Sequence, residues 1–178
     1  MKLKRFVIAL LVIAVVVIAF CYKMYSPCCE KKEEQSMPSV VSLNEARDLF
    51  NLEEKIDILP ASGEHKIIHV FTTWCSCCKG EGPELEKISK DYDVTGLVWS
   101  KNAEDAKKWL DENGNHYTKV GIINDDEIVM LGISKTPMTL VLDHDGNVRC
   151  GFKGAITKEK FDSEITQRCL SNQVQVHQ

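Results

Sequence analysis

The sequence predicts an α/β domain, in which helices flank a central mixed β-sheet, behind an N-terminal transmembrane anchor. Two apolar runs rich in branched residues, 67–70 and 138–142, are typical of buried strands. Residues 103–113 carry apolar side chains at helical spacing, so we expect helices to alternate with strands. An almost unbroken run of 17 apolar residues, 6–22, precedes all of these segments. Together these observations predict an anchor, a linker and one domain.

Length and composition agree with that division. The chain has 178 residues, of which 44% are hydrophobic, and a formal net charge of −4. Residues 1–38 hold six basic and three acidic residues, which leaves 16 basic and 23 acidic residues in 39–178. An acidic domain of ordinary core size gives no indication of a nucleic-acid partner.

The run 6–22 has the properties of a membrane span. A helix of this length reaches roughly 26 Å, at about 1.5 Å per residue, which is enough for a thin bilayer. Lys2, Lys4 and Arg5 precede the run, which predicts that the N-terminus lies in the cytoplasm and the rest of the chain outside it. A cleaved signal peptide is the alternative, but no small-x-small cleavage site closes the run. We therefore expect an uncleaved anchor.

The anchor and the cytoplasmic start are assigned to residues 1–25, and the domain to residues 40–178. Residues 26–39 are charged and lack apolar periodicity, which predicts a solvated linker. Cys28 and Cys29 in this linker could be acylation sites, a second redox pair, the ends of an intermolecular disulfide, or incidental thiols.

Inside the domain, polar residues mark where helices begin. Ser42 or Asn44 could cap a short helix over residues 42–50, and Asn102 is expected to cap the helix at 103–113. Apolar runs bounded by turn residues supply the strands. The other expected elements, in order, are a strand at 66–72, a helix at 81–92, a strand at 96–100, a hairpin of strands at 138–142 and 148–152, and a last helix capped by Thr157.

Cys75 and Cys78 lie where the strand at 66–72 gives way to helical sequence. The unpaired N–H groups and the dipole at a helix N-terminus stabilise an anion, which lowers the pKa of a thiol there. A C-x-x-C spacing also brings two sulfurs close enough to cycle between dithiol and disulfide. The position and the spacing together predict redox chemistry.

The motif Trp74-Cys75-x-x-Cys78 after an apolar strand resembles the redox motif of thioredoxin-fold proteins. Residues 78–85, CKGEGPEL, are similar to the C-R-x-E-x-P-x-L pattern of membrane-tethered, TlpA-like thioredoxin relatives. Residues 106–117, A-x-x-W-L-x-E-x-G-N-x-Y, resemble a helix and turn of the DsbE or CcmG group, the thiol-disulfide interchange proteins of cytochrome c maturation. The resemblance covers roughly residues 64–170 and implies the thioredoxin fold.

We expect Cys75 to be the nucleophile and Cys78 the resolving thiol of a redox disulfide. The first cysteine of such a motif is the more exposed, so its thiolate attacks a substrate disulfide and the second cysteine resolves the mixed disulfide. A structural disulfide or half of a zinc site is the alternative, but no second well-spaced Cys or His pair is evident. No metal and no cofactor is expected.

Further site residues follow from the resemblance. Pro137 resembles the cis-proline that faces the active site, which leaves the backbone of Thr136 free to pair with a substrate segment, and Trp74 is expected to contact that substrate. An ordinary trans proline is the alternative. Glu81 matches an acidic residue that could modulate the thiol pKa or shuttle protons, although it could equally be a first-turn glutamate stabilised by the dipole.

Some residues depart from the family pattern or have two interpretations. Cys77 replaces a usual proline, and Met138 replaces a glutamate, so the reduction potential and the specificity do not transfer. His69 could exchange a proton with Cys78 or be a satisfied core residue. Cys150 and Cys169 could form a disulfide, but we favour two small buried thiols.

The resemblance implies a thiol-disulfide oxidoreductase in the bacterial inner membrane, with its catalytic domain facing the periplasm. Its substrate would be the disulfide of an apocytochrome c C-x-x-C-H haem site or of a haem-lyase component. Its electrons would come from a transmembrane thiol reductase similar to DsbD or CcdA. A general periplasmic reductase or oxidant is one alternative. A Cu(I)-binding module built on Cys75, Cys77 and Cys78, with Met138 as a further candidate ligand, is another, although copper-delivery relatives space their cysteines as C-x-x-x-C.

Overall fold

The computed structural model describes residues 13, 15–17, 43–61, 65–163 and 169. The chain divides into two units, Met1–Glu30 and Lys31–Gln178. In the first unit, the described residues 13 and 15–17 are helical and exposed. No helix within the described ranges is long and apolar enough to cross a membrane. Most of the expected anchor and all of the expected linker lie outside those ranges.

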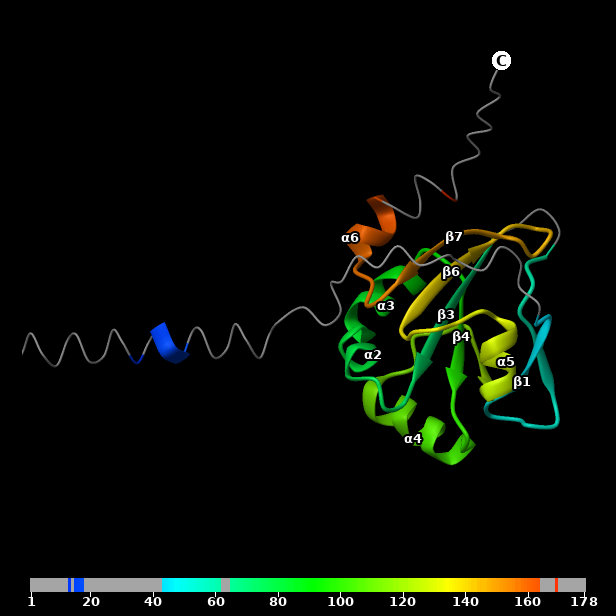
Figure 1. The fold of residues 1–178 in the computed structure, drawn as a ribbon, viewed down its shortest axis with the longest axis horizontal. Coiled ribbons are helices and arrows are strands. Elements are labelled where there is room, and N and C mark those ends of the chain that lie inside the picture. The colour runs from blue at the N-terminus through cyan, green and yellow to red at the C-terminus, as the bar shows by residue number, and fades with distance from the viewer. Residues whose placement is uncertain (1–12, 14, 18–42, 62–64, 164–168, 170–178) are drawn as a thin grey trace, which may run out of the picture. The chain divides into compact units, whose positions relative to one another are not determined.

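Seven strands of the described chain form one mixed sheet in the order β2-β1-β5-β4-β3-β6-β7 (Figure 1). The central strands β3, β4 and β5 run parallel, while β6, β7, β1 and β2 pair antiparallel. The strands are β1 (Glu45–Asp48), β2 (Lys55–Asp57), β3 (Lys66–Thr72), β4 (Val94–Trp99), β5 (Lys119–Ile123), β6 (Met138–Leu142) and β7 (Val148–Lys153). The mixed sheet predicted from the sequence is thus present.

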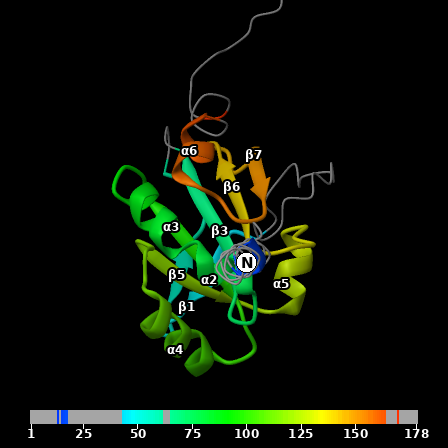
Figure 2. The same cartoon turned by 90° about the vertical axis from the view of Figure 1, so that its left-hand side faces the viewer.

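Helices cover both faces of this sheet. Figure 2 shows α3 and α4 on one side of the strands and α5 on the other. The helices described in the second unit are α2 (Ser76–Gly80), α3 (Gly82–Ser89), α4 (Ala103–Asn113), α5 (Asp125–Met130) and α6 (Lys158–Lys160). The predicted cap of α4 is confirmed, because the Asn102 side chain accepts the Glu104 N–H. Thr157 likewise caps α6.

The alternation of β3 divides the core between the two faces. Ile68 and Val70 pack on one face with Ile128 of α5. Phe71 packs on the other face with Leu110 of α4. Because β3 is central, six of its seven residues are buried, and each large apolar side chain there contributes roughly 1.5–3 kcal/mol by its removal from water. The end of β3 is therefore a rigid platform for the residues that follow.

The helix predicted over residues 42–50 is wrong, because this segment contains the strand β1. Its burial follows the two-residue period of a strand, with Ala46 buried between exposed Glu45 and Arg47. Ala46 fits because Gly121 of β5 lies opposite, where a Cβ would come within 2.7 Å of the Ala46 Cβ. The capping signals at 42–44 were outweighed by this pairing in the sheet.

The helix predicted over residues 81–92 begins earlier and is divided in two. α2 begins at Ser76, and Glu81 both ends α2 and precedes α3. Pro83 lies in the first turn of α3, where a missing N–H leaves no helical hydrogen bond unmade. The predictions did not include β2, β5 or α5.

Candidate active site

Cys75 lies directly after the buried end of β3 and caps α2. Its N–H donates to the carbonyl oxygen of Thr72 at 3.4 Å, and its Sγ accepts the N–H of Cys78 at 3.3 Å. The sulfur therefore accepts an N–H that has no partner within the helix, and a thiolate is stabilised at this position. Cys75 is half-buried, whereas Cys78 is only 2% exposed, and both are free thiols. An incoming disulfide can thus approach Cys75 rather than Cys78.

The loop between α5 and β6 lies beside Cys75 and forms the other side of the site. The Thr136–Pro137 peptide bond is cis, as predicted. The carbonyl oxygen of Thr136 lies 3.7 Å from Cys75 Sγ. Pro137 is fixed from behind, because its own carbonyl accepts the N–H of Gly154 at 2.8 Å. The fold therefore brings together Cys75 and Thr136, which are 61 positions apart in the sequence. The substrate contacts assigned to Trp74, Thr136 and Pro137 stay predictions.

Burial is the main reason that the pKa of the Cys78 thiol lies far above its ordinary value of 9.0. The hydrogen bond with the Cys75 sulfur and the negative charges of Cys75 and Glu81 raise this pKa further, whereas a hydrogen bond with the Thr72 backbone opposes the shift. Cys78 therefore keeps its proton at neutral pH. It needs a proton acceptor before it can attack a mixed disulfide.

A buried pair, His69 and Glu81, lies beneath the cysteines. His69 Nε2 and Glu81 Oε2 are 3.3 Å apart, and both side chains are 1% exposed. Neither atom has a well-aligned hydrogen bond within the described part of the chain. The other carboxyl oxygen, Oε1, accepts the N–H of Ile156 at 2.7 Å. Of this buried pair, the charge of Glu81 acts on Cys78 and raises the pKa of its thiol.

Tyr117 completes this network. Its hydroxyl lies 2.9 Å from His69 Nδ1, and its ring stacks near both His69 and Phe71. If the hydroxyl donates to Nδ1, then Nε2 carries the proton and faces Glu81. Burial, and then the charges of Glu81 and Cys78, hold the pKa of Tyr117 well above 10.0, so its hydroxyl stays protonated at neutral pH. The Tyr117 hydroxyl thus has a proton that it can donate to His69 Nδ1 in the ordinary pH range.

Trp74 exposes a large apolar surface beside Cys75, with 62% of the residue accessible. Its ring meets Trp99 edge-on, with the ring centroids 5.5 Å apart. Trp99 is held in turn, because its Nε1–H donates to Asp125 Oδ1 at 2.8 Å. Asp125 also forms an ion pair with Lys101. A fixed aromatic surface of this kind suits contact with a polypeptide.

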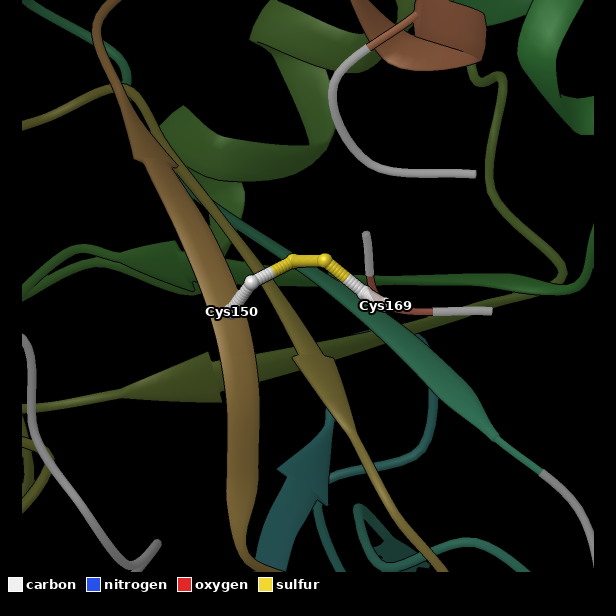
Figure 3. The surroundings of a disulfide bond; sticks show 2 residues. All are labelled: Cys150 and Cys169. Carbon is white, nitrogen blue, oxygen red and sulfur yellow. A yellow bond between two sulfur atoms is a disulfide. The ribbon is translucent and has the colours of Figure 1, made fainter. Parts of the chain in front are cut away.

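The remaining described cysteines are paired. Cys150 on β7 and Cys169 form a disulfide, with their Cα atoms 6.0 Å apart (Figure 3). Our preference for two unpaired thiols there is wrong, because β7 brings Cys150 close to Cys169 in the same buried cluster. Cys77 is also disulfide-bonded while Cys78 is free, so no vicinal bridge joins these two residues.

Within the described ranges, no group of three or more His, Cys, Asp or Glu side chains could hold a metal ion. The disulfide at Cys77 also removes one of the thiols that the copper alternative required.

Sequence reasoning did not identify three residues of this site. Trp99 is brought to the site by the register of β4, and Tyr117 by the loop before β5. Ile156 contributes only its backbone N–H. The position of Trp99 at the end of a buried strand was the available signal, since side chains at such strand ends gather around one edge of a parallel sheet.

Comparison with known proteins adds to this geometry. A model of the thioredoxin-like domain matches residues 52–168. Thiol:disulfide interchange protein DsbE of Xylella fastidiosa is 31% identical over 109 residues, covering 58% of this chain and 54% of that protein. DsbE of Pasteurella multocida is 30% identical over 133 residues, covering 70% of each chain. The chain thus spans only about half the length of the Xylella relative.

Solved structures show a likeness in fold. A putative thiol:disulfide interchange protein DsbE from Chlorobium tepidum superposes with a TM-score of 0.63 at 14% identity, covering 76% of this chain and 99% of that one. StoA from Bacillus subtilis gives a TM-score of 0.59 at 19% identity, covering 71% and 98%. The sheet and helices around Cys75 and Cys78 therefore have the arrangement called the thioredoxin fold.

Proposed function

This chain belongs to the thioredoxin-like family of DsbE-type thiol:disulfide interchange proteins, and from that premise we propose that it reduces protein disulfides outside the cytoplasm. The observation that carries the proposal is the unequal pair of thiols: an accessible Cys75 at a helix N-terminus and a buried Cys78 that retains its proton. Unequal thiols of this kind suit a nucleophile and a resolving group.

In the first step, the Cys75 thiolate attacks one sulfur of the client disulfide. A bond forms between Cys75 Sγ and that sulfur, while the other client sulfur leaves as a thiolate and takes up a proton. The Thr136 carbonyl beside Cys75 and the exposed ring of Trp74 support binding of an extended client segment here. Pro137 fixes the backbone of Thr136 beside Cys75.

In the second step, Cys78 loses its proton and attacks Cys75 Sγ. The Cys75–Cys78 disulfide forms and the second client sulfur leaves as a thiol, so two electrons have passed from the protein to the client. Glu81, with His69, is the group we assign to accept the Cys78 proton, because its charge already acts on this thiol in the buried site. The reaction needs no cofactor.

The direction of electron flow that we propose rests on the resemblance to the DsbE group, and the raised pKa of Cys78 adds one contribution in the same direction. A dithiol is a poor reductant when its thiolate form is strongly stabilised, because that stabilisation favours the reduced protein. Here burial and negative charge destabilise the Cys78 thiolate. This effect alone favours giving electrons over taking them.

The client we propose is the oxidised C-x-x-C-H haem site of an apocytochrome c, or a haem-lyase component that holds it. The family name and the motifs at residues 78–85 and 106–117 support this client. We further propose that residues 1–25 anchor the protein in the bacterial inner membrane, that the domain faces the periplasm, and that a transmembrane thiol reductase similar to DsbD or CcdA re-reduces it. A general disulfide reductase with other clients remains the second candidate.

The test uses the full chain and an oxidised apocytochrome peptide containing one C-x-x-C-H site. Wild-type protein should reduce it, Cys75→Ser should be inactive, and Cys78→Ser should accumulate a mixed disulfide with the peptide. A matched peptide in which serine replaces the histidine distinguishes the two candidates. Equal rates on both peptides would favour a general reductase, and activity that survives Cys75→Ser would rule out the proposed mechanism.

A further inference from the structure

The segment between β7 and α6 contacts the active site through two backbone groups, the Gly154 N–H at Pro137 and the Ile156 N–H at Glu81. Ile156 donates its N–H to Glu81 Oε1 at 2.7 Å, although the two residues are 75 positions apart. Ile156 is 1% exposed and Glu81 is 2% exposed, so water does not compete for this hydrogen bond. A carboxylate with one oxygen fixed in this way has a defined position.

A second, parallel contact fixes the same segment to α3. Lys158 donates its N–H to Glu84 Oε2 at 2.8 Å, and its Nζ forms ion pairs with Asp91 and Asp162. Glu81 and Glu84, three residues apart, therefore hold two N–H groups that are two residues apart. The segment and the start of α3 behave as one clamped unit.

The Cys150–Cys169 disulfide holds this segment from the other side. Ile156 and Cys169 are buried in one apolar cluster, and Cys150 packs against that cluster. The disulfide closes a loop with a sequence separation of 19, and Ile156 lies inside that loop. Closing the loop restricts the positions that the Ile156 N–H can take.

The described groups around Glu81 show what its position controls. His69 on β3 faces Oε2 at 3.3 Å, and the charge of Glu81 raises the pKa of both Cys78 on α2 and Tyr117. On the α3 side, the ring of His116 lies against Gly82, where a Cβ would be 3.3 Å from Nε2. Displacing the Glu81 carboxylate would therefore lower the pKa of the Cys78 thiol.

We propose that Ile156, held by the Cys150–Cys169 disulfide, is a positioning residue that fixes Glu81 and through it sets the pH at which Cys78 reacts. This inference rests on the proposed function, since it concerns the resolving thiol of that reaction. It assigns to the C-terminal disulfide an effect on the active-site chemistry in addition to its effect on stability.

The test measures the rate at which iodoacetamide alkylates Cys78 as a function of pH, in full-length protein that carries Cys75→Ser. The alkylation of each cysteine is quantified separately. Replacing both Cys150 and Cys169 by serine should release Glu81 and displace the rising limb of the profile by about half a pH unit toward lower pH. That shift corresponds to an about threefold faster alkylation of Cys78 at a fixed pH on the rising limb. In a Glu81→Gln background the same double replacement should leave the profile unchanged, because no charge remains to be displaced.

A second pair of variants leaves the disulfide intact. Ile156→Pro removes the N–H that Glu81 accepts and should shift the profile in the same direction. Ala155→Pro removes a neighbouring N–H that Glu81 does not accept and should not shift it. Urea unfolding of each variant establishes that the protein measured is folded.

Two results would overturn the inference. One is an unchanged Cys78 profile after loss of the disulfide and of the Ile156 N–H. The other is an equal shift whether Glu81 is intact or replaced by glutamine, which would indicate general loosening. Reduction of the apocytochrome peptide by protein with Cys75 intact is measured in parallel. If that activity is absent the proposed function fails, whereas activity without the shift contradicts this inference alone.

Discussion

The ring of Tyr117 lies directly over Gly96, so that a Cβ atom on this residue would come within 2.7 Å of Tyr117 Cγ. Gly96 is paired with His69 across β3 and β4, and the absence of a side chain at Gly96 lets the ring lie flat on the sheet. The Tyr117 hydroxyl can then reach His69 Nδ1. A glycine on β4 is thus a structural requirement of the buried network beneath the cysteines.

Gly96→Ala should destabilise the protein by roughly 1–3 kcal/mol, because the Tyr117 ring must move away from the new methyl group. Urea unfolding measures the loss. Gly80→Ala is the matched control, since no atom outside its own helix lies within 4 Å of a Cβ at Gly80. That change should be neutral or stabilising by up to about 1 kcal/mol. Similar losses for the two variants would show that the Tyr117 ring does not lie over Gly96.

The stability of the reduced protein should fall at alkaline pH. The folded-state pKa of Cys78 is raised above its ordinary value of 9.0, and that of Tyr117 above 10.0. Below pH 9 both groups are protonated in the folded and unfolded states, so the stabilisation is complete. As the pH rises past 9, the unfolded chain loses the Cys78 proton while the folded protein keeps it, and stability falls by about 1.4 kcal/mol per pH unit.

The oxidised protein provides the control for that slope. A Cys75–Cys78 disulfide does not titrate, so the decline should begin only above about pH 10, where Tyr117 contributes. Urea midpoints measured from neutral pH to about pH 10.5 would show the difference. Parallel slopes for the reduced and oxidised forms would mean that Cys78 does not retain its proton in the folded state.

Asp125→Asn should weaken binding of a polypeptide client. The change weakens the acceptor that holds Trp99, and Trp99 supports the exposed ring of Trp74. We expect KM for a peptide disulfide to rise about threefold, the effect of one modest hydrogen bond, with kcat unchanged. KM for a small disulfide such as oxidised glutathione should not change.

Asp126→Asn is the matched control for this prediction. Asp126 is exposed on the same turn of α5 and carries the same charge, but the acceptor for Trp99 is Asp125. Equal effects of the two variants on the peptide would indicate a general loss of negative charge rather than loss of support for the Trp74 surface.

The sequence predicted those parts of the site that depend on local signals. The caps at Asn102 and Thr157 and the C-x-x-C spacing at Cys75 and Cys78 each involve residues a few positions apart. Residues 45–48 were misassigned because the segment carries capping residues but pairs with β5, more than 70 positions further on.

The rest depends on contacts between distant segments. Cys150 and Cys169 gave no local indication that they pair, and the Ile156 N–H that Glu81 accepts belongs to a backbone group that any residue except proline would supply. Tyr117 could be placed near His69 only once the register of β3 and β4 was known.

Removing the Cys150–Cys169 disulfide should also lower stability. Closing a loop of this length lowers the conformational entropy of the unfolded chain, which raises the free energy of unfolding by roughly 3 kcal/mol. The double replacement by serine, unfolded in urea at neutral pH beside oxidised wild-type protein, should show a lower midpoint. A midpoint equal to that of wild type would mean that the pairing contributes nothing to the folded state.

The reduction potential of the Cys75/Cys78 pair tests the central claim most directly. It is measured by equilibrating the full-length protein with glutathione or dithiothreitol buffers at neutral pH and quantifying the Cys75–Cys78 disulfide. From the resemblance to the DsbE group, with the disfavoured Cys78 thiolate acting in the same direction, we predict a reductant, with a potential near the thioredoxin end of the scale at about −270 mV or somewhat above. A potential near about −120 mV would identify an oxidant and would contradict the account.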